Sequence, residues 1–379
     1  MRPAKVVTIA EVARVITGKT PSTKEPLFWD GDIPFVTPGD LQSLKNIKVT
    51  SRTVSHLVYA RMAKQLLPAR SICVSCIGNL GYAGMTIKPS LSNQQINSLI
   101  PHNVADADFL YYSMKGLWPF FKSFEGQSTT LSILNKTQFS KIKILWPDET
   151  VRRKIGYILN LFDSKIEYNT KLNGYLLELA MARFESALEG KSKTVRFGDI
   201  VAFEDSKRVP LNSRDREARK GPYPYYGATS VMDYVDGYLF DGIRVLLGED
   251  GTVIDSEGRP ILQYVWGKYW VNNHAHILAS SGEYSLEAIY VALRRTAINH
   301  IVTGAVQMKI SQRNLKSLEL EMPSPKSLDY LQDLFAAYRS NRDESAKLAS
   351  LRDALLPKLM SGEIDVTKVD LTQLNSHLA

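Results

Sequence analysis

Two stretches of the chain carry apolar residues at intervals of three and four, the spacing of an α-helix with one apolar face. The first contains Ile155, Leu159, Phe162, Ile166, Leu172, Leu176, Leu179 and Phe184. The second contains Leu328, Leu331, Leu334, Phe335, Tyr338, Leu348, Leu351 and Leu355. These patterns predict long helices over residues 148–190 and 324–362. Because neither helix can bury its own apolar face, we expect the two to pack as an antiparallel coiled coil.

The residues at the predicted helix ends agree with this interpretation. Asp148 can cap the first helix, and Gly190 can end it. Ser324 and Pro325 suit the start of the second helix, because proline is tolerated in a first turn. Pro357 lies inside the second predicted helix, and it predicts a kink or an earlier stop there.

The segments before the two helices show short alternating runs and many turn residues, which are typical of strands. Residues 70–77 lead into a glycine-rich turn, and residues 243–248 lead into Glu249-Asp250-Gly251. We also expect short helices near residues 105–117 and 285–297. The predicted fold class is α+β, with two tandem mixed α/β domains separated by the long helices. In chain order these parts are domain 1 (1–147), helix (148–190), domain 2 (193–323), helix (324–362) and a C-terminal tail (363–379).

The two domains repeat the same sequence features in the same order. Five pairs of segments match: 7–12 with 195–200, 33–36 with 223–226, 92–97 with 271–276, 109–111 with 288–290, and 134–139 with 310–315. One such match would be weak, but five in order predict a tandem duplication with a pseudo-two-fold internal repeat.

Composition narrows the class of protein. The chain has 379 residues, of which 44% are hydrophobic, and its formal net charge is +8. Its positive excess lies within residues 1–147, while residues 193–323 carry equal numbers of acidic and basic side chains. We find no apolar run long enough for a membrane helix and no signal peptide. Only two cysteines are present, which excludes a disulfide framework and favours a reducing cytoplasm.

Several short motifs suggest chemistry that their context does not support. Cys73 and Cys76 have C-x-x-C spacing, but they lie in an alternating strand, so we expect structural packing and no metal site. His274 and His276 share one strand face without an accompanying acidic triad, so a satisfied or surface pair is favoured over a metal site, with DNA contact as the alternative. Pro147-Asp148 with Asp163-Ser164-Lys165 fits a nuclease pattern, but these residues fall on a helix. The chain contains no nucleotide-binding glycine motif and no methyltransferase tetrapeptide, so we predict no catalytic residues.

Three segments of domain 1 resemble the target recognition domain of type I restriction–modification specificity (S) subunits. They are Ile-Thr-Gly-Lys-Thr-Pro-Ser at 16–22, Trp-Asp-Gly-Asp-Ile-Pro-Phe-Val at 29–36 with Gly-Asp-Leu at 39–41, and Ser-Asn-Gln-Gln-Ile-Asn at 92–97. Residues 351–364 are similar to the second conserved helix of that family. Domain 2 departs from the pattern at 206–210 and at 249–251, so we expect the two domains to read different DNA sequences.

The resemblance implies a non-catalytic DNA specificity subunit. Each recognition domain would read one half of a bipartite double-stranded DNA target, and the helices would set the spacer and dock the methyltransferase (M) subunits. It implies two M subunits per chain, which use S-adenosylmethionine, and through them restriction (R) subunits, which use ATP and Mg²⁺. This chain is expected to bind no cofactor and no membrane, and to work in a prokaryotic cytoplasm. The alternative is an enzyme, in which the same domains form the recognition portion of a fused DNA methyltransferase or nuclease.

Amides and guanidinium groups on exposed loops are the side chains that read bases, and nearby cations contact phosphates. The DNA-binding candidates are Lys19, Thr20, Ser22, Lys24, Asn79, Gln94, Gln95 and Asn97 in domain 1, and Lys207, Arg208, Tyr226, Arg244, Asn272 and Asn273 in domain 2. Lys45, Lys48 and Arg52 extend a basic stretch suited to phosphate contacts. Turn capping or surface solubility is the alternative for the polar candidates, and core packing is the alternative for Tyr226.

Overall fold

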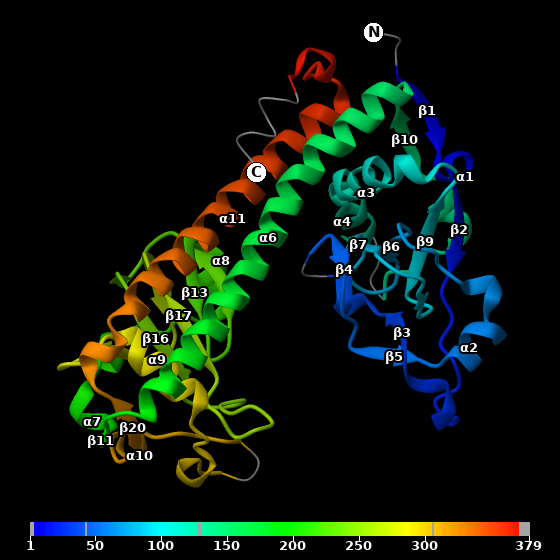
Figure 1. Cartoon of the computed structure of the whole chain (residues 1–379). Coiled ribbons are helices and arrows are strands. Elements are labelled where there is room, and N and C mark those ends of the chain that lie inside the picture. Colours follow the sequence, from blue (N-terminus) through cyan, green and yellow to red (C-terminus); the bar gives the residue numbers. More distant parts are fainter. Residues whose placement is uncertain (1–3, 42–43, 127–130, 305–306, 371–379) are drawn as a thin grey trace. The chain divides into compact units, whose positions relative to one another are not determined.

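The computed structural model describes residues 4–41, 44–126, 131–304 and 307–370. The chain forms two compact units: unit 1 comprises Met1–Thr170 with Arg342–Ala379, and unit 2 comprises Lys171–Asn341 (Figure 1). Each unit therefore combines a strand-rich segment with part of both long helices.

Unit 1 is built around a five-stranded and a three-stranded sheet. The first has the strand order β2 (Ala13–Thr17), β9 (Ile96–Pro101), β6 (Ile72–Ser75), β7 (Ala83–Thr86), β4 (Asn46–Ile47). The second has the order β5 (Arg52–Val54), β3 (Trp29–Val36), β8 (Leu91–Ser92), and a further pair joins β1 (Lys5–Thr8) to β10 (Lys143–Trp146). The helices are α1 (Ile9–Val12), α2 (His56–Arg61), α3 (Ala107–Gly116), α4 (Trp118–Gly126), α5 (Lys136–Ser140) and the first part of α6 (Glu149–Leu188).

Unit 2 repeats this plan with a pair of four-stranded sheets. One has the order β12 (Val201–Phe203), β19 (Ala275–Ser280), β16 (Arg244–Gly248), β17 (Leu262–Val265), and the other has the order β14 (Val231–Val235), β13 (Lys220–Tyr226), β18 (Lys268–Val271), β15 (Phe240–Asp241). A pair joins β11 (Ser192–Arg196) to β20 (Glu319–Pro323). The helices are α7 (Phe197–Ile200), α8 (Ser213–Ala218), α9 (Leu286–Arg295), α10 (Gln312–Lys316) and the first part of α11 (Tyr330–Ser361).

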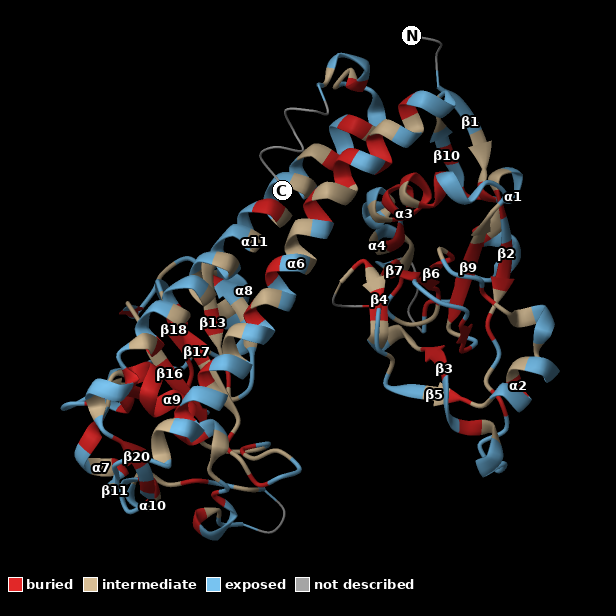
Figure 2. Ribbon diagram, in the orientation of Figure 1, coloured by how far each residue is buried: buried red, intermediate tan, exposed pale blue. Residues whose placement is uncertain are grey.

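The structure confirms the internal repeat. β3 pairs in parallel with β8, with Phe35 opposite Leu91, and β13 pairs in parallel with β18, with Tyr225 opposite Trp270. In unit 1 the buried residues gather on β6, β9 and α3, and in unit 2 they gather on β16 and α9 (Figure 2). The short helices predicted near 105–117 and 285–297 are α3 and α9.

Both long helices are present. The main difference from the prediction is the start of the second helix. Asp148 caps α6, since its carboxylate accepts a hydrogen bond from the Val151 amide at 3.1 Å. α11 begins only at Tyr330, because Ser324 and the residues after it form a separate 3₁₀ turn over Pro325–Leu328. The early stop expected at Pro357 is wrong, because α11 continues to Ser361. Every helix among the described residues is too short or too polar to cross a membrane.

In unit 1 the two long helices run antiparallel and are joined by polar contacts (Figure 1). The Asn169 amide donates to Glu344 at 2.7 Å. Further along, Asp163 on α6 accepts hydrogen bonds from Arg352 on α11 and from the Tyr112 hydroxyl on α3. The side chains of Asp163 and Arg352 are 10% and 16% exposed, so this is a largely buried ion pair. It ties the recognition segment of unit 1 to both of its helices.

Unit 2 has a similar junction with different charges. Arg339 on α11 donates to the Tyr264 hydroxyl and lies 3.3 Å from Glu287 on α9. Tyr264 in turn donates to Glu287 at 2.7 Å. Ile144 in β10 and Leu320 in β20 have equivalent positions in the two units. Asp163 follows Ile144 by the same number of residues as Arg339 follows Leu320, so Asp163 and Arg339 are equivalent positions. The two helices therefore meet their recognition segments with opposite charges.

Candidate DNA-binding interface

In unit 1 the tip between β8 and β9 carries the predicted glutamines. Asn93 shapes this tip: its amide donates to the Val36 carbonyl at 3.0 Å, and its side-chain oxygen accepts from the Gln95 amide at 3.1 Å. Gln94 is exposed, and its side-chain oxygen accepts the Thr20 hydroxyl at 2.5 Å. The structure thus brings Thr20 and Gln94 together from segments that are distant in the sequence.

Gly18 allows these two segments to approach each other. A Cβ at this position would lie 2.1 Å from the Asn93 carbonyl oxygen, which is far inside van der Waals contact. The next residue, Lys19, is exposed, and its amide donates to the Ser92 carbonyl at 2.9 Å. Ser22 and Lys24 follow on an exposed loop, where the Lys24 amide donates to the Ser22 hydroxyl at 3.3 Å. Lys19 therefore stands beside the tip, and Lys24 lies on the exposed loop that follows Lys19 in the chain.

The remaining candidates in unit 1 are placed differently from one another. Asn79 is exposed on the turn after β6, where its backbone carbonyl accepts the Ser75 hydroxyl at 2.7 Å. Asn97 is 1% exposed, and both ends of its side chain are used: it accepts from the Thr17 hydroxyl at 2.7 Å and donates to the Leu134 carbonyl at 3.0 Å. Asn97 supports the tip from inside the sheet, and in this conformation it does not face a ligand.

Lys45 does not lie on the basic surface predicted for it. Its side chain is 2% exposed and forms an ion pair with Asp108 at 2.5 Å. The expectation of a phosphate contact at Lys45 is therefore wrong, because its ammonium group is buried and binds the half-buried carboxylate of Asp108. Lys48 forms an ion pair with Glu167, and Arg52 stacks on Trp29 at 3.5 Å from the ring centre.

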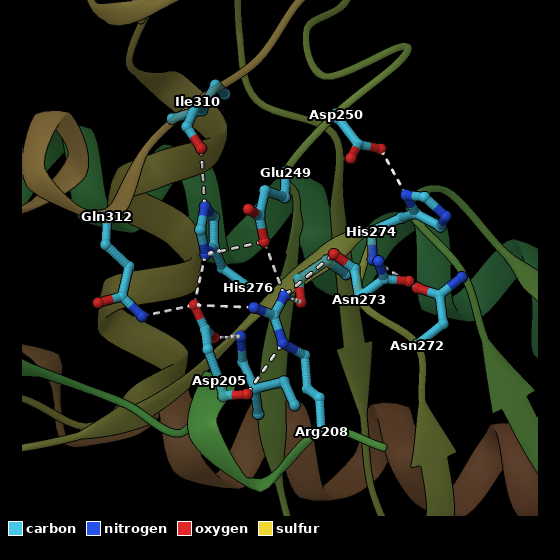
Figure 3. Close-up of polar contacts among 12 residues, drawn as sticks. Asp205, Arg208, Glu249, Asp250, Asn272, Asn273, His274, His276, Ile310 and Gln312 are labelled. Carbon is cyan, nitrogen blue, oxygen red and sulfur yellow. Dashed lines mark hydrogen bonds and ion pairs between the residues drawn. The ribbon is translucent and has the colours of Figure 1, made fainter. Parts of the chain in front are cut away.

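Figure 3 shows the corresponding tip of unit 2, which lies between β18 and β19. Asn272 is buried, its amide donates to the Tyr226 carbonyl at 3.0 Å, and its side-chain oxygen accepts from the His274 amide at 2.8 Å. Asn273 is exposed at the end of the tip. His274 is also exposed, and its Nδ1 lies 2.7 Å from the Asp250 carboxylate. His274 and Asp250 belong to the tip; a DNA contact was only the alternative for His274, and Asp250 was not among the candidates.

Behind this tip lies a buried cluster of charged groups (Figure 3). His276 is 2% exposed, with Nδ1 at 2.6 Å from Asp205 and Nε2 at 2.8 Å from the Ile310 carbonyl oxygen. Each ring nitrogen thus faces an oxygen acceptor, and the ring is fixed from both sides. Arg208 adds an ion pair to Glu249 at 2.7 Å. No acidic partner for this histidine is evident in the sequence, whereas the fold places two beside it, Asp205 and Glu249.

Several hydrogen bonds together lower the pKa of Asp205 against the opposing effect of burial. Burial alone would raise its pKa, but donors from His276, Gln312 and the Ile277 amide outweigh burial and lower the pKa below the usual aspartate value. Gln312 lies 2.5 Å from the same carboxylate. The carboxylate is therefore ionised at neutral pH and holds the first part of β19 in place.

Asp205, Glu249 and His276 are close enough together to suggest a metal site, since their ligand atoms lie within 4.8 Å of one another. The donors around them do not fit a cation. His276 uses both ring nitrogens, and Arg208 occupies the Glu249 oxygen that would face the ion. This cluster is better explained as an ion-pair network that supports the tip.

The last candidates of unit 2 lie around Glu204. This carboxylate pairs with Lys207 and with Arg244, each at 2.7 Å, and the hydrogen bond from Arg244 is the main cause that lowers its pKa. Lys207 remains exposed, while Arg208 and Arg244 are half-buried and engaged within the unit. Tyr226 is half-buried and packs edge-on against Tyr269, 5.7 Å between ring centres. Lys207 is thus the exposed cation of this group.

Cys73 and Cys76 face opposite sides of their sheet, as the alternating pattern predicts. Cys73 packs with Ile16 and Val36, and Cys76 packs with Leu80 and Leu134. Burial raises the pKa of each thiol to about 12. Neither is therefore suited to metal binding or redox chemistry.

We expect both thiols to resist a disulfide reagent such as DTNB in the folded protein at pH 8 and to react fully after denaturation. With a pKa of about 12 the thiolate fraction is about one in ten thousand. Absorbance of the released thiolate measures both rates. Comparable rates before and after denaturation would contradict the burial described here.

Comparisons with known proteins agree with this double architecture. A family model described as the type I restriction modification DNA specificity domain matches residues 1–177 and again 189–348. The type I restriction enzyme MjaIX specificity subunit of Methanocaldococcus jannaschii is 24% identical over 405 residues, covering 95% of this chain and 93% of that protein. The HindI specificity subunit of Haemophilus influenzae is 37% identical over 145 residues, covering 38% of this chain and 32% of its own length.

Among solved structures, the S subunit of a type I restriction-modification system from M. genitalium matches 95% of this chain and 99% of its own, with a TM-score of 0.52 and 18% identity. This similarity supports the fold. The comparisons do not support the alternative of a fused methyltransferase or nuclease. Since both halves match the family model, the resemblance found in the motifs is confirmed: the chain belongs to the type I restriction modification DNA specificity domain family and carries two copies of that domain.

Proposed function

We propose that this chain is the non-catalytic DNA specificity subunit of a type I restriction–modification complex, and that each unit reads one half of a bipartite double-stranded target. The observation that carries the proposal is the repeated tip. In each unit an asparagine fixes the same backbone turn, Asn93 in unit 1 and Asn272 in unit 2, and different polar side chains follow it. A scaffold built twice with different exposed side chains suits two different half-sites.

The distribution of charge supports a division of labour between the units. The net positive excess lies in residues 1–147, Lys19 is exposed beside the first tip, and Lys24 is exposed on the loop that follows Lys19. Unit 1 would therefore supply more of the salt-dependent contact with phosphates. Unit 2, whose strand-rich segment is electrically balanced, would contribute chiefly through base contacts.

The long helices supply the part of the function that concerns assembly. We propose that α6 and α11 set the spacer between half-sites and dock the methyltransferase subunits, two per chain, through which restriction subunits join. In this scheme S-adenosylmethionine, ATP and Mg²⁺ are bound by those partners, and this chain binds none of them. The complex would act on DNA in a prokaryotic cytoplasm.

Replacing Gln94 and Gln95 by alanine is expected to relax the first half-site and leave the second unchanged. Loss of a specific base contact lowers discrimination by at most about 1–3 kcal/mol, so the variant should methylate sites with substitutions at one or two positions of that half. The measurement is single-molecule sequencing of DNA modified by this chain together with its methyltransferase partner.

The control for that experiment is Gln332→Ala, which removes an exposed glutamine from α11 of unit 2. This variant should keep the parental motif. A contiguous motif from the unaltered chain would overturn the bipartite function. Relaxation of the second half-site by the Gln94 and Gln95 changes would overturn the assignment of unit 1.

A further inference from the structure

The tips of the two units share one backbone arrangement down to individual hydrogen bonds. The Gln95 carbonyl accepts from the Cys76 amide at 2.8 Å, and the His274 carbonyl accepts from the Glu249 amide at 2.9 Å. Gln95 and His274 each follow an asparagine by two residues and donate their amide to its side chain. His274 therefore occupies the position that Gln95 occupies in unit 1.

The neighbouring turn shows the same equivalence. Ile77 forms an isolated bridge with Ile133, and Asp250 forms one with Lys309. The glycine that follows has a positive φ in both units, 78° at Gly78 and 86° at Gly251. Asp250 thus stands where unit 1 has the apolar Ile77, and the duplication has placed a carboxylate beside the second tip alone.

In unit 2 this substitution joins Asp250 to His274. The contact between Nδ1 and the carboxylate oxygen is 2.7 Å long, and the two side chains are 22% and 46% exposed. Because a carboxylate only accepts, Nδ1 carries the proton, and in the neutral imidazole Nε2 is left as an acceptor. The pair therefore offers acceptors to a ligand: the remaining lone pairs of Asp250 in either form of His274, and also Nε2 of His274 in the neutral form.

In unit 1 the two glutamines of the tip, of which Gln95 is the equivalent of His274, offer the opposite polarity. The Gln94 oxygen is occupied by the Thr20 hydroxyl at 2.5 Å, and the Gln95 oxygen is occupied by the Asn93 amide group at 3.1 Å. Each glutamine is left with its NH₂ group as a donor. Donors suit the acceptors N7 and O6 of guanine, N7 of adenine or O4 of thymine.

We propose that His274 and Asp250 form a base-reading pair of unit 2 that accepts a hydrogen bond from the exocyclic amine of adenine or cytosine in the major groove. These amines, N6 of adenine and N4 of cytosine, are the donors on that edge of the duplex. The inference rests on the proposed function, and it adds which chemical group the second tip recognises.

The surroundings of the pair favour a base over a phosphate. Thr229, Thr252 and Asn272 line a pocket of about 390 Å³ together with His274 and Asp250. The Asn272 side chain is fixed by the His274 amide and by the Met232 sulfur, so the pocket wall is held in place. A carboxylate at the mouth repels phosphate, whereas a base amine can donate to it.

The test is binding of the complex of this chain and its methyltransferase partner to duplexes that lack one amine at a time. Purine replaces adenine, or pyrimidin-2-one replaces cytosine, at each position of the second half-site. For the unaltered chain, removing the amine at one position of the second half-site should lower the affinity about 5- to 150-fold, the range of a specific base contact. Whether that position responds to purine or to pyrimidin-2-one identifies the base.

Asp250→Ala and His274→Ala then test the assignment. Each variant should bind the natural duplex more weakly and should lose little further affinity, less than about 2-fold, when that amine is removed. Glu257→Ala, which removes an exposed carboxylate elsewhere in unit 2, should respond to amine removal like the unaltered chain. If both tip variants still lose as much as the unaltered chain at every position, the inference is wrong.

The outcome can be separated from a failure of the proposed function. Amine removal in the first half-site should affect the tip variants and the unaltered chain equally, which also shows that the variants are folded. If whole base-pair substitutions in the second half-site leave the affinity of the unaltered chain unchanged, the bipartite function itself fails. If it responds there and the tip variants respond identically, only the reading by His274 and Asp250 fails.

Discussion

Replacement of Asp205 by alanine is expected to cost unit 2 about 3–5 kcal/mol of stability, the range for removing one partner of a buried ion pair. Asp205 is 8% exposed and accepts hydrogen bonds from His276, Gln312 and the Ile277 amide. Its removal leaves the Nδ1 atom of His276, the Gln312 amide and the Ile277 amide without their common acceptor inside unit 2. Hydrogen exchange of residues 272–280, followed by mass spectrometry, would report the loss where it arises.

The pH dependence of this effect has a definite sign. Because the folded pKa of Asp205 is lowered, its contribution is fully present above the unfolded value of about 3.9 and is lost as pH falls through the folded pKa. Asp205→Asn should therefore flatten the acid side of the stability profile of unit 2. Asp215→Asn, at an exposed site on α8, is the matched control and should keep the profile. An unchanged acid limb in Asp205→Asn would contradict this role.

Replacement of Asp163 by alanine should destabilise unit 1 by a similar amount, about 3–5 kcal/mol. The change removes the acceptor for Arg352 and for the Tyr112 hydroxyl, and both donors remain buried. Asp163→Ala with Arg352→Ala should cost less than the sum of the single changes, because each single change already removes the interaction between the two side chains. Urea unfolding of the single and double variants measures this coupling.

A surface pair provides the comparison for Asp163. Lys358 and Glu363 are both more than half exposed, at 53% and 63%. Glu363→Ala should leave the unfolding midpoint unchanged, since exposed ion pairs contribute little. Strictly additive effects for Asp163 and Arg352 would show that the two side chains do not interact.

The long helices and the duplication could be predicted because each depends on a regular pattern over many residues. The ends of the long helices were harder to predict from the sequence. Ser324 and Pro325 suit a helix start, but here the chain closes a tighter turn, with the Ser327 amide donating to the Ser324 carbonyl at 3.0 Å. At Pro357 the helix loses one backbone hydrogen bond, yet Leu356 and Leu359 on either side are buried and hold it.

The candidate site was only partly predictable for a different reason. Gln94 and Asn273 stand out as amides in a repeated motif, and both are exposed at tips. Asp250 can be recognised as part of the tip only in the folded chain, because the pairing of β16 with β19 brings it beside His274 from a distant segment. The phosphate contact predicted for Lys45 was wrong because Lys45 lies in a basic stretch of the sequence, whereas its ion-pair partner Asp108 comes from a distant segment.

The opposite charges at the two helix junctions bear on how such a chain can evolve. Arg339 pairs with Glu287, and the equivalent position in α6 is Asp163. A recombination that moved the second strand-rich segment onto α6 would leave Glu287 without Arg339, whereas Asp108, at the same place in unit 1, is paired with Lys45 and Arg70 of its own segment. Each segment is therefore fitted to its own helix, and viable exchange should replace a recognition segment with another from the same position in a related chain.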